Sequence, residues 1–172
     1  MQAELEVLSK LDVARHQLSS AIWLFFEHRD PVSVHTLAAA ARQVLHDLAG
    51  GSSSIITENP ALRPEWRSEW VKNVKTAENF FKHAVRDPDG TFEFRPEFTR
   101  FFIYDATHLY RTVTNELFYE AQMYQAWFSL AYPYFVLDPG FRTMLDDARQ
   151  QGVDGSDFAF VRFLLQTRAF AT

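Results

Sequence analysis

Residues 10–48 read KLDVARHQLSSAIWLFFEHRDPVSVHTLAAAARQVLHDL and contain two apolar stripes separated by a helix start signal. In the first stripe, apolar residues follow one another at steps of three and four, which is the spacing of an amphipathic helix. With the preceding turn, this stripe consists of Val7, Leu11, Ala14, Leu18, Ala21, Ile22 and Phe25. We therefore predict a first long helix that ends near His28.

Asp30 and Pro31 are typical of a helix start. The aspartate side chain can accept a hydrogen bond from a free backbone N–H, and proline lacks the N–H that has no partner at that position. The second stripe consists of Val34, Leu37, Ala38, Ala41, Leu45 and Leu48. Gly50 and Gly51 then end the predicted helix. Because the connection is only about two residues long, the two helices should form an antiparallel hairpin.

Helical periodicity continues through most of the remaining chain. Residues 50–63 are aperiodic and rich in Gly, Ser, Asn and Pro, which predicts an exposed loop. We expect further helices over 64–85, after Pro96, and over about 115–135, 141–150 and 157–169, with a short extended piece at 91–94. No repeat or low-complexity linker divides the chain. The sequence predicts an all-α fold, a single-domain helical bundle of about seven helices over residues 1–172.

The composition favours a globular domain with an aromatic-rich core, since 47% of the residues are hydrophobic and 16% are aromatic. A net charge of −5 disfavours nucleic acid or an anionic membrane as a partner. The absence of cysteine excludes disulfides and thiolate chemistry. The N-terminal residues do not form a basic region followed by an apolar one, as an export signal would. We expect a cytoplasmic protein without a cofactor.

Three polar residues lie together on one flank of the second predicted helix: His35, Arg42 and His46. Such a group could bind an anion, relay protons or ligate a metal, and the alternative is a solvent-exposed or partner-facing flank. His35 and His46 are about 16 Å apart by helical rise, so they cannot share one metal. On the fourth helix, Asp105 and His108 have the spacing to pair with each other. We predict no metal site, and we treat the flank as a candidate ligand or partner surface.

Aromatic residues supply the other candidates. Trp23 lies away from the apolar stripe of the first helix, which predicts either burial against another helix or a homodimer contact. We expect a homodimer. Tyr124 and Trp127 belong to an aromatic helix that either packs in the core or lines a pocket for a flat apolar ligand.

The stretch RDPVSVH at 29–35 places an arginine, a polar residue and then a histidine near the start of a helix. It resembles the catalytic motif of the HEPN superfamily, whose helical domains often act as metal-independent ribonucleases with the motif doubled across a dimer. The resemblance implies that Arg29 would bind phosphate and that His35 would be the acid or base of a 2′-OH attack.

A second resemblance rests on residues 10–48, with LFFEHRDP at 24–31 and HTLA at 35–38, and on NFFKH at 79–83 followed by RDPD at 86–89. These segments are similar to a group of uncharacterised small helical bacterial proteins. The resemblance implies a bacterial source and a helical fold.

These observations favour a non-enzymatic helical-bundle protein that acts through a protein partner or a small ligand. One alternative is a HEPN-like ribonuclease using Arg29 and His35. Another is a small-molecule sensor with an aromatic pocket beside Trp127.

Overall fold

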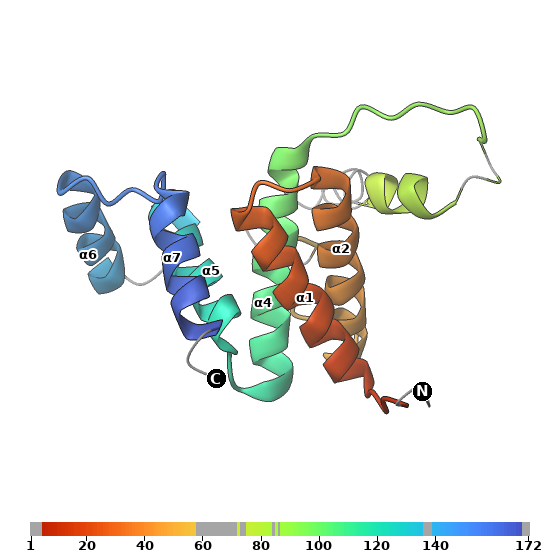
Figure 1. The fold of residues 1–172 in the computed structure, drawn as a ribbon, viewed down its shortest axis with the longest axis horizontal. Coiled ribbons are helices and arrows are strands. Elements are labelled where there is room, and N and C mark those ends of the chain that lie inside the picture. The colour runs from red at the N-terminus through yellow and green to blue at the C-terminus, as the bar shows by residue number, and fades with distance from the viewer. Residues whose placement is uncertain are drawn as a thin grey trace.

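Helices dominate the computed structural model, which describes residues 5–57, 72, 75–83, 85, 87–135 and 139–169 (Figure 1). The long helices are α1 (Lys10–Phe26), α2 (Pro31–Leu48), α4 (Thr99–Thr114), α5 (Tyr119–Ala131), α6 (Pro139–Gln150) and α7 (Phe158–Ala169). Two 3-10 helices, η1 (Pro96–Phe98) and η2 (Pro133–Phe135), precede α4 and follow α5. Residues 75–82 are also helical. The described part of the chain contains no strand, so the predicted all-α class is confirmed.

The α1–α2 hairpin forms where the sequence predicts it. Ser9 and Asp12 make a capping box at the start of α1, each side chain accepting a hydrogen bond from the other's backbone N–H. Asp30 caps α2 by accepting a hydrogen bond of 2.8 Å from the Ser33 backbone. Alanines such as Ala21 and Ala38 are fully buried and allow close packing of the helices. The hairpin thus rests on caps that the sequence itself contains.

Figure 1 shows α4 packed beside the hairpin, with α5 and α7 on the other side of α1 and α4, and α6 at the far end. Helix α4 ends at Asn115, whose φ of 59° is a left-handed conformation that asparagine tolerates. The packing of α1, α2 and α4 against one another forms the main bundle, and α6 packs mainly on η2 and α5.

An aromatic core joins the main bundle to α5 and α7. Tyr124 is fully buried, and its hydroxyl donates a hydrogen bond of 2.9 Å to the Arg100 carbonyl oxygen. The Trp127 indole donates one of 2.7 Å to the Gly155 carbonyl oxygen. The rings of Phe25, Phe26, Tyr124, Trp127 and Phe158 contact one another. Of the two expectations for Tyr124 and Trp127, core packing describes what these side chains do.

The loop expected at 50–63 is described for residues 50–57, and these are only partly exposed, which corrects the prediction for that part. Ser54 and Ile56 are buried, because the Ser54 side chain binds polar groups of α2 and α4. Residues 58–63 lie outside the described residues, as do residues 64–71 of the helix expected over 64–85.

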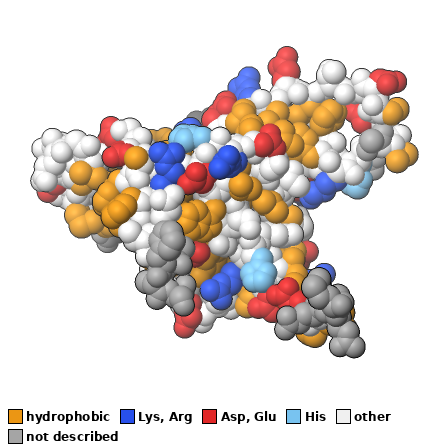
Figure 2. Space-filling view, in the orientation of Figure 1, with side chains coloured by type: hydrophobic (Ala, Val, Ile, Leu, Met, Phe, Trp, Pro, Cys, Tyr) orange, Lys and Arg blue, Asp and Glu red, His pale blue; other side chains and the backbone are white. Residues whose placement is uncertain are grey.

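Hydrophobic side chains also reach the surface. Figure 2 shows them gathered between α6 and α7 and beneath the extended segment that leads into α4. Among the described helices, none is long and apolar enough to span a bilayer.

Candidate ligand pocket

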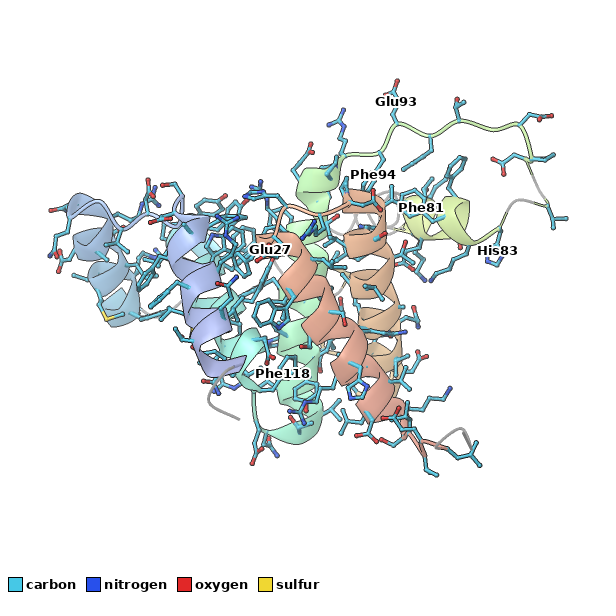
Figure 3. All side chains as sticks on the ribbon, in the orientation of Figure 1. Glu27, Phe81, His83, Glu93, Phe94 and Phe118 are labelled. Atoms are coloured by element: carbon cyan, nitrogen blue, oxygen red, sulfur yellow. The ribbon has the colours of Figure 1, made fainter. Side chains whose placement is uncertain are left out.

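An extended segment, residues 91–95, crosses from the helical residues 75–82 to the start of α4. Its side chains alternate: Phe92 and Phe94 are partly buried, whereas Thr91, Glu93 and Arg95 are exposed. This is the period of two that an extended backbone imposes. In Figure 3, Glu93 points away from the molecule, whereas Phe94 and Phe81 lie beneath the segment. The segment therefore turns one apolar face toward the bundle.

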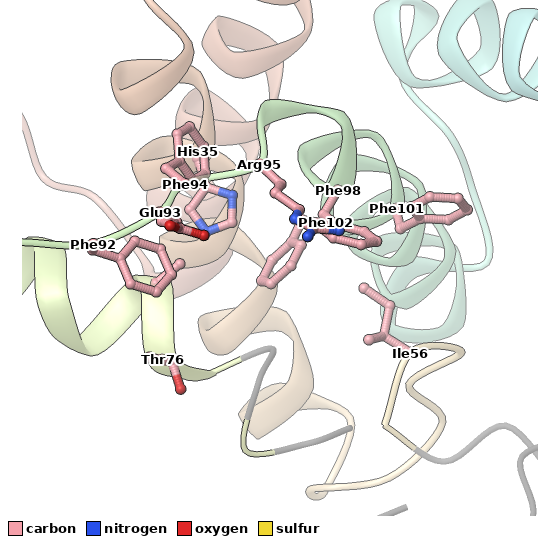
Figure 4. Close-up of a pocket in the computed structure, with 11 residues that line it drawn as sticks. His35, Ile56, Thr76, Phe92, Glu93, Phe94, Arg95, Phe98, Phe101 and Phe102 are labelled. Carbon is pink, nitrogen blue, oxygen red and sulfur yellow. The ribbon is translucent and has the colours of Figure 1, made fainter. Parts of the chain in front are cut away.

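A cavity of about 440 Å³ lies under this segment, between helix 75–82, α2 and α4 (Figure 4). Its lining consists of His35, Ile56, Thr76, Ala77, Phe92, Glu93, Phe94, Arg95, Phe98, Phe101 and Phe102. Five of these eleven side chains are phenylalanine. A volume of this size falls in the lower part of the range of about 300–1,000 Å³ that is typical of small-molecule sites.

His35 is the buried polar side chain of the lining, with 2% of its surface exposed. Its Nδ1 lies 3.0 Å from the hydroxyl oxygen of Thr99, the first residue of α4. Its ring contacts the rings of Phe81, Phe94 and Phe102 at centroid distances of 4.5–5.7 Å. Its Nε2 is buried and has no hydrogen-bond partner among the described residues.

Burial determines the charge of His35. Desolvation, with a smaller contribution from the Lys82 charge, lowers the pKa of His35 to about 4. The hydrogen-bond partner of the ring, Thr99, belongs to α4. At neutral pH the imidazole is uncharged, so Nε2 can serve as one neutral donor or acceptor.

Arg42 lies seven residues further along α2 and is also buried. Its Nε donates a hydrogen bond of 2.7 Å to Asp105 of α4, whose side chain is fully buried. Its NH2 group donates one of 2.9 Å to Ser54. Asp105 further accepts hydrogen bonds from the Ser54 hydroxyl and the Ile55 backbone N–H. We call Arg42, Asp105, Ser54 and the Ile55 N–H the buried polar network.

Asp105 therefore pairs with Arg42 across the bundle and not with His108, contrary to the sequence-based expectation. The reason is burial: α2 brings a guanidinium against α4, and a buried carboxylate needs an opposite charge.

Glu78 is a further buried acid near this region, and Lys82 lies 4.0 Å from its carboxylate. Burial raises the pKa of Glu78. Its Oε1 has no hydrogen-bond partner in the part of the chain that is described.

The remaining predicted site residues lie elsewhere. His46 is partly buried on α2, and Trp23 is partly buried and packs against the hydrophobic core. Arg29 is exposed in the α1–α2 connection and does not line the cavity. A solvent-exposed flank, one of the two interpretations of His35 and Arg42, is wrong for both because both are buried.

Sequence reasoning missed the phenylalanines of the pocket and the Thr99 partner of His35. The alternation at 91–94 was a usable signal, because two phenylalanines separated by one polar residue predict a one-sided apolar strand-like segment.

Within the described ranges, no group of three or more His, Asp or Glu side chains is placed to hold a metal ion. Comparisons with protein-family models, with curated proteins and with solved structures found no match.

Proposed function

We propose that this chain is a non-enzymatic ligand-binding protein that takes a small, flat, apolar molecule into the His35 cavity. The supporting observation is the cavity itself, about 440 Å³ and lined by five phenylalanines and one buried histidine. Aromatic rings favour flat ligands because offset-stacked and edge-to-face contacts add to the free energy of apolar burial. The cavity with its few polar groups is typical of a binding site.

Catalysis finds less support in the same residues. A general acid or base works best with a pKa near the operating pH. Burial and Lys82 hold the pKa of His35 at about 4, so at neutral pH its ring is uncharged, which makes it a poor general acid and a weak general base. Glu93 and Arg95 are exposed at the rim.

Naphthalene is a suitable probe, because it is flat, apolar and fluorescent. We expect saturable binding at one site per chain, followed by the fluorescence of the probe. Ala77→Phe should weaken binding at least tenfold, because Ala77 lines the cavity and a phenyl ring there would occupy it.

Two variants serve as controls. Ala126→Phe places the same ring on an exposed position of α5, and Phe163→Ala removes an exposed ring of α7. Both should bind naphthalene as the unchanged protein does. The proposal fails if naphthalene does not bind, if Ala77→Phe binds it equally well, or if only Phe163→Ala loses binding.

A second candidate function is association with a second copy of the chain, as the sequence predicts. Large apolar side chains of α6 and α7 are exposed, among them Met144, Phe160 and Phe163 at 56–59%. Light scattering at tens of micromolar should give twice the chain mass of 20.0 kDa. Phe163→Glu should lower the mass to that of one chain. A monomer at that concentration would refute this proposal.

The HEPN-like alternative needs Arg29 and His35 to face one open cleft. Arg29 is exposed and His35 is buried, so the arrangement lends this alternative little support. We expect no cleavage of single-stranded RNA without metal. Cleavage by the unchanged protein, lost in a normally folded His35→Ala variant, would establish the alternative instead. A cytoplasmic location and a bacterial source stay predictions of the sequence.

A further inference from the structure

The polar group of the ligand can be inferred from His35, the buried polar side chain among the described residues of the lining. We infer that the ligand is a neutral aromatic molecule with a hydroxyl group on its ring, and that this hydroxyl hydrogen-bonds to Nε2 of His35. The inference rests on the proposed function and specifies the class of ligand that the cavity takes.

The His35 ring has one nitrogen, Nε2, that hydrogen-bonds to no described residue. Thr99 occupies the Nδ1 edge of the ring, and the phenylalanines that surround the ring carry no hydrogen-bonding group. Nε2 is buried without a partner among the described residues. A buried polar atom without a partner costs free energy, and a ligand that supplies the partner recovers it.

The tautomer of His35 decides which kind of partner Nε2 needs. The Thr99 hydroxyl can donate to Nδ1 or accept from it, so Nε2 is either a donor or an acceptor. A ring hydroxyl can donate or accept as required, whereas an ether oxygen only accepts and an ammonium group only donates. A hydroxyl therefore fits either tautomer of His35.

The charges of the described lining favour a neutral ligand. The charged side chains of the lining, Glu93 and Arg95, are exposed and opposite in sign. Around His35 the described lining is phenylalanine, and no charged residue of that described lining is buried. The Lys82 charge that acts on His35 belongs to an exposed side chain outside the lining. An ionised group placed there would lose its hydration without compensation, so a neutral ligand is favoured.

A ligand must pass one wall of the cavity to reach Nε2. Because Nε2 is buried, a ligand reaches it by displacing part of the wall. No backbone hydrogen bond joins residues 91–94 to the rest of the described chain. Phe92 and Phe94 hold this segment through ring contacts with Phe80, Phe81 and His35. Segments with few backbone hydrogen bonds open at low free-energy cost, so residues 91–94 are the wall that moves.

The test compares ligands that share one ring system on the unchanged protein. We expect 1-naphthol to bind at least tenfold more tightly than naphthalene, although its hydroxyl makes it the more water-soluble of the two. We also expect 1-naphthol to bind more tightly than the 1-naphthoate anion and the 1-naphthylmethylammonium cation. The inference is overturned if naphthalene binds as tightly as 1-naphthol, or if either ion binds more tightly.

His35→Phe supplies the matched variant, because it keeps a ring and removes both nitrogens. The ratio of the naphthalene and 1-naphthol dissociation constants should fall to about one or below it, because the hydroxyl then has no partner. The inference would also be overturned if His35→Phe gave the same ratio as the original protein. Failure of the proposed function is a separate result, in which no member of the series binds or Ala77→Phe binds them all as before. The ligand series needs no variant, so the inference stays testable even if His35→Phe does not fold.

Discussion

His35 and Arg42 lie seven residues apart on one face of α2, both are buried, and both are joined to α4, yet their surroundings differ. Arg42 donates hydrogen bonds to Asp105 and Ser54. His35 has a partner for Nδ1 and none for Nε2 among the described residues. The Phe102 ring lies between the two regions, 4.5 Å from the His35 ring and 5.8 Å from the Arg42 guanidinium carbon.

The difference comes from the segment that covers each residue. Residues 54–57 fold over Arg42 and Asp105. The hydroxyls of Ser54 and Thr57 accept hydrogen bonds from Arg42, and the Ile55 backbone N–H donates one to Asp105. Residues 91–95 fold over His35 and bring phenylalanine rings. A satisfied polar network stabilises the fold, whereas a half-satisfied polar group in a cavity is available to a ligand. The comparison therefore separates a structural cross-link from a binding site.

Asp105→Ala should have the largest effect on stability. It leaves the Arg42 charge buried without its counter-charge, which costs roughly 3–5 kcal/mol. Urea unfolding followed by tryptophan fluorescence measures this loss. Asp146→Ala removes an exposed acid of α6 and should stay within about 0.5 kcal/mol of the unchanged protein. A loss below about 1 kcal/mol for Asp105→Ala would show that the network does not hold α2 to α4.

The pH dependence of stability should reveal the neutral state of His35. The pKa of His35 is about 4 in the folded chain, against 6.5 for an unperturbed histidine. As the pH falls from 6.5 to 4, the unfolded chain takes up the proton first, so stability decreases. The shift corresponds to roughly 3 kcal/mol over that window.

Glu78 acts in the opposite direction, because burial raises its pKa and the folded chain then holds the proton more firmly. The informative quantity is therefore the difference between the unchanged protein and His35→Phe, measured by urea unfolding at several pH values. Between pH 6.5 and 4 the unchanged protein should lose more stability than the variant. Parallel pH profiles would contradict the buried, neutral histidine.

Ser54→Ala should have an intermediate effect. The Ser54 hydroxyl donates to Asp105 and accepts from Arg42 and from the Thr57 backbone. Its loss leaves buried polar atoms without a partner, at a cost of about 1–3 kcal/mol. Ser52→Ala changes an exposed serine two residues away and is the matched control. Equal stability of the two variants would mean that residues 54–57 do not complete the network.

Thr99→Val should have the smallest effect, because it removes one hydrogen bond and keeps the side-chain shape. We expect a loss of about 1 kcal/mol, measured as a lower melting temperature. Thr112→Val, on an exposed position of α4, controls for the change of residue type. If Thr99→Val costs more than Ser54→Ala, then His35 and not Arg42 is the stronger link between α2 and α4.

Local signals in the sequence predicted the helices well. These signals are the Asp30–Pro31 helix start, the glycines that follow α2 and the periodic apolar stripes. Each of them depends only on residues close together in the chain. The helix expected over 141–150 begins at Pro139, and that over 157–169 begins at Phe158. The aromatic helix expected over about 115–135 is shorter at both ends, because α5 begins at Tyr119 and ends at Ala131, two residues before Pro133.

The sequence by itself also placed His35 and Arg42 on one face of one helix, because a helical wheel depends only on residue spacing. Tertiary structure decided that this face is buried and which polar groups it meets. Asp105 lies 63 residues from Arg42, and Thr99 lies 64 residues from His35. A hydrogen bond between such distant residues depends on how the helices pack, and periodicity within one helix carries no information about that packing. The network and the cavity are therefore properties of the packed bundle.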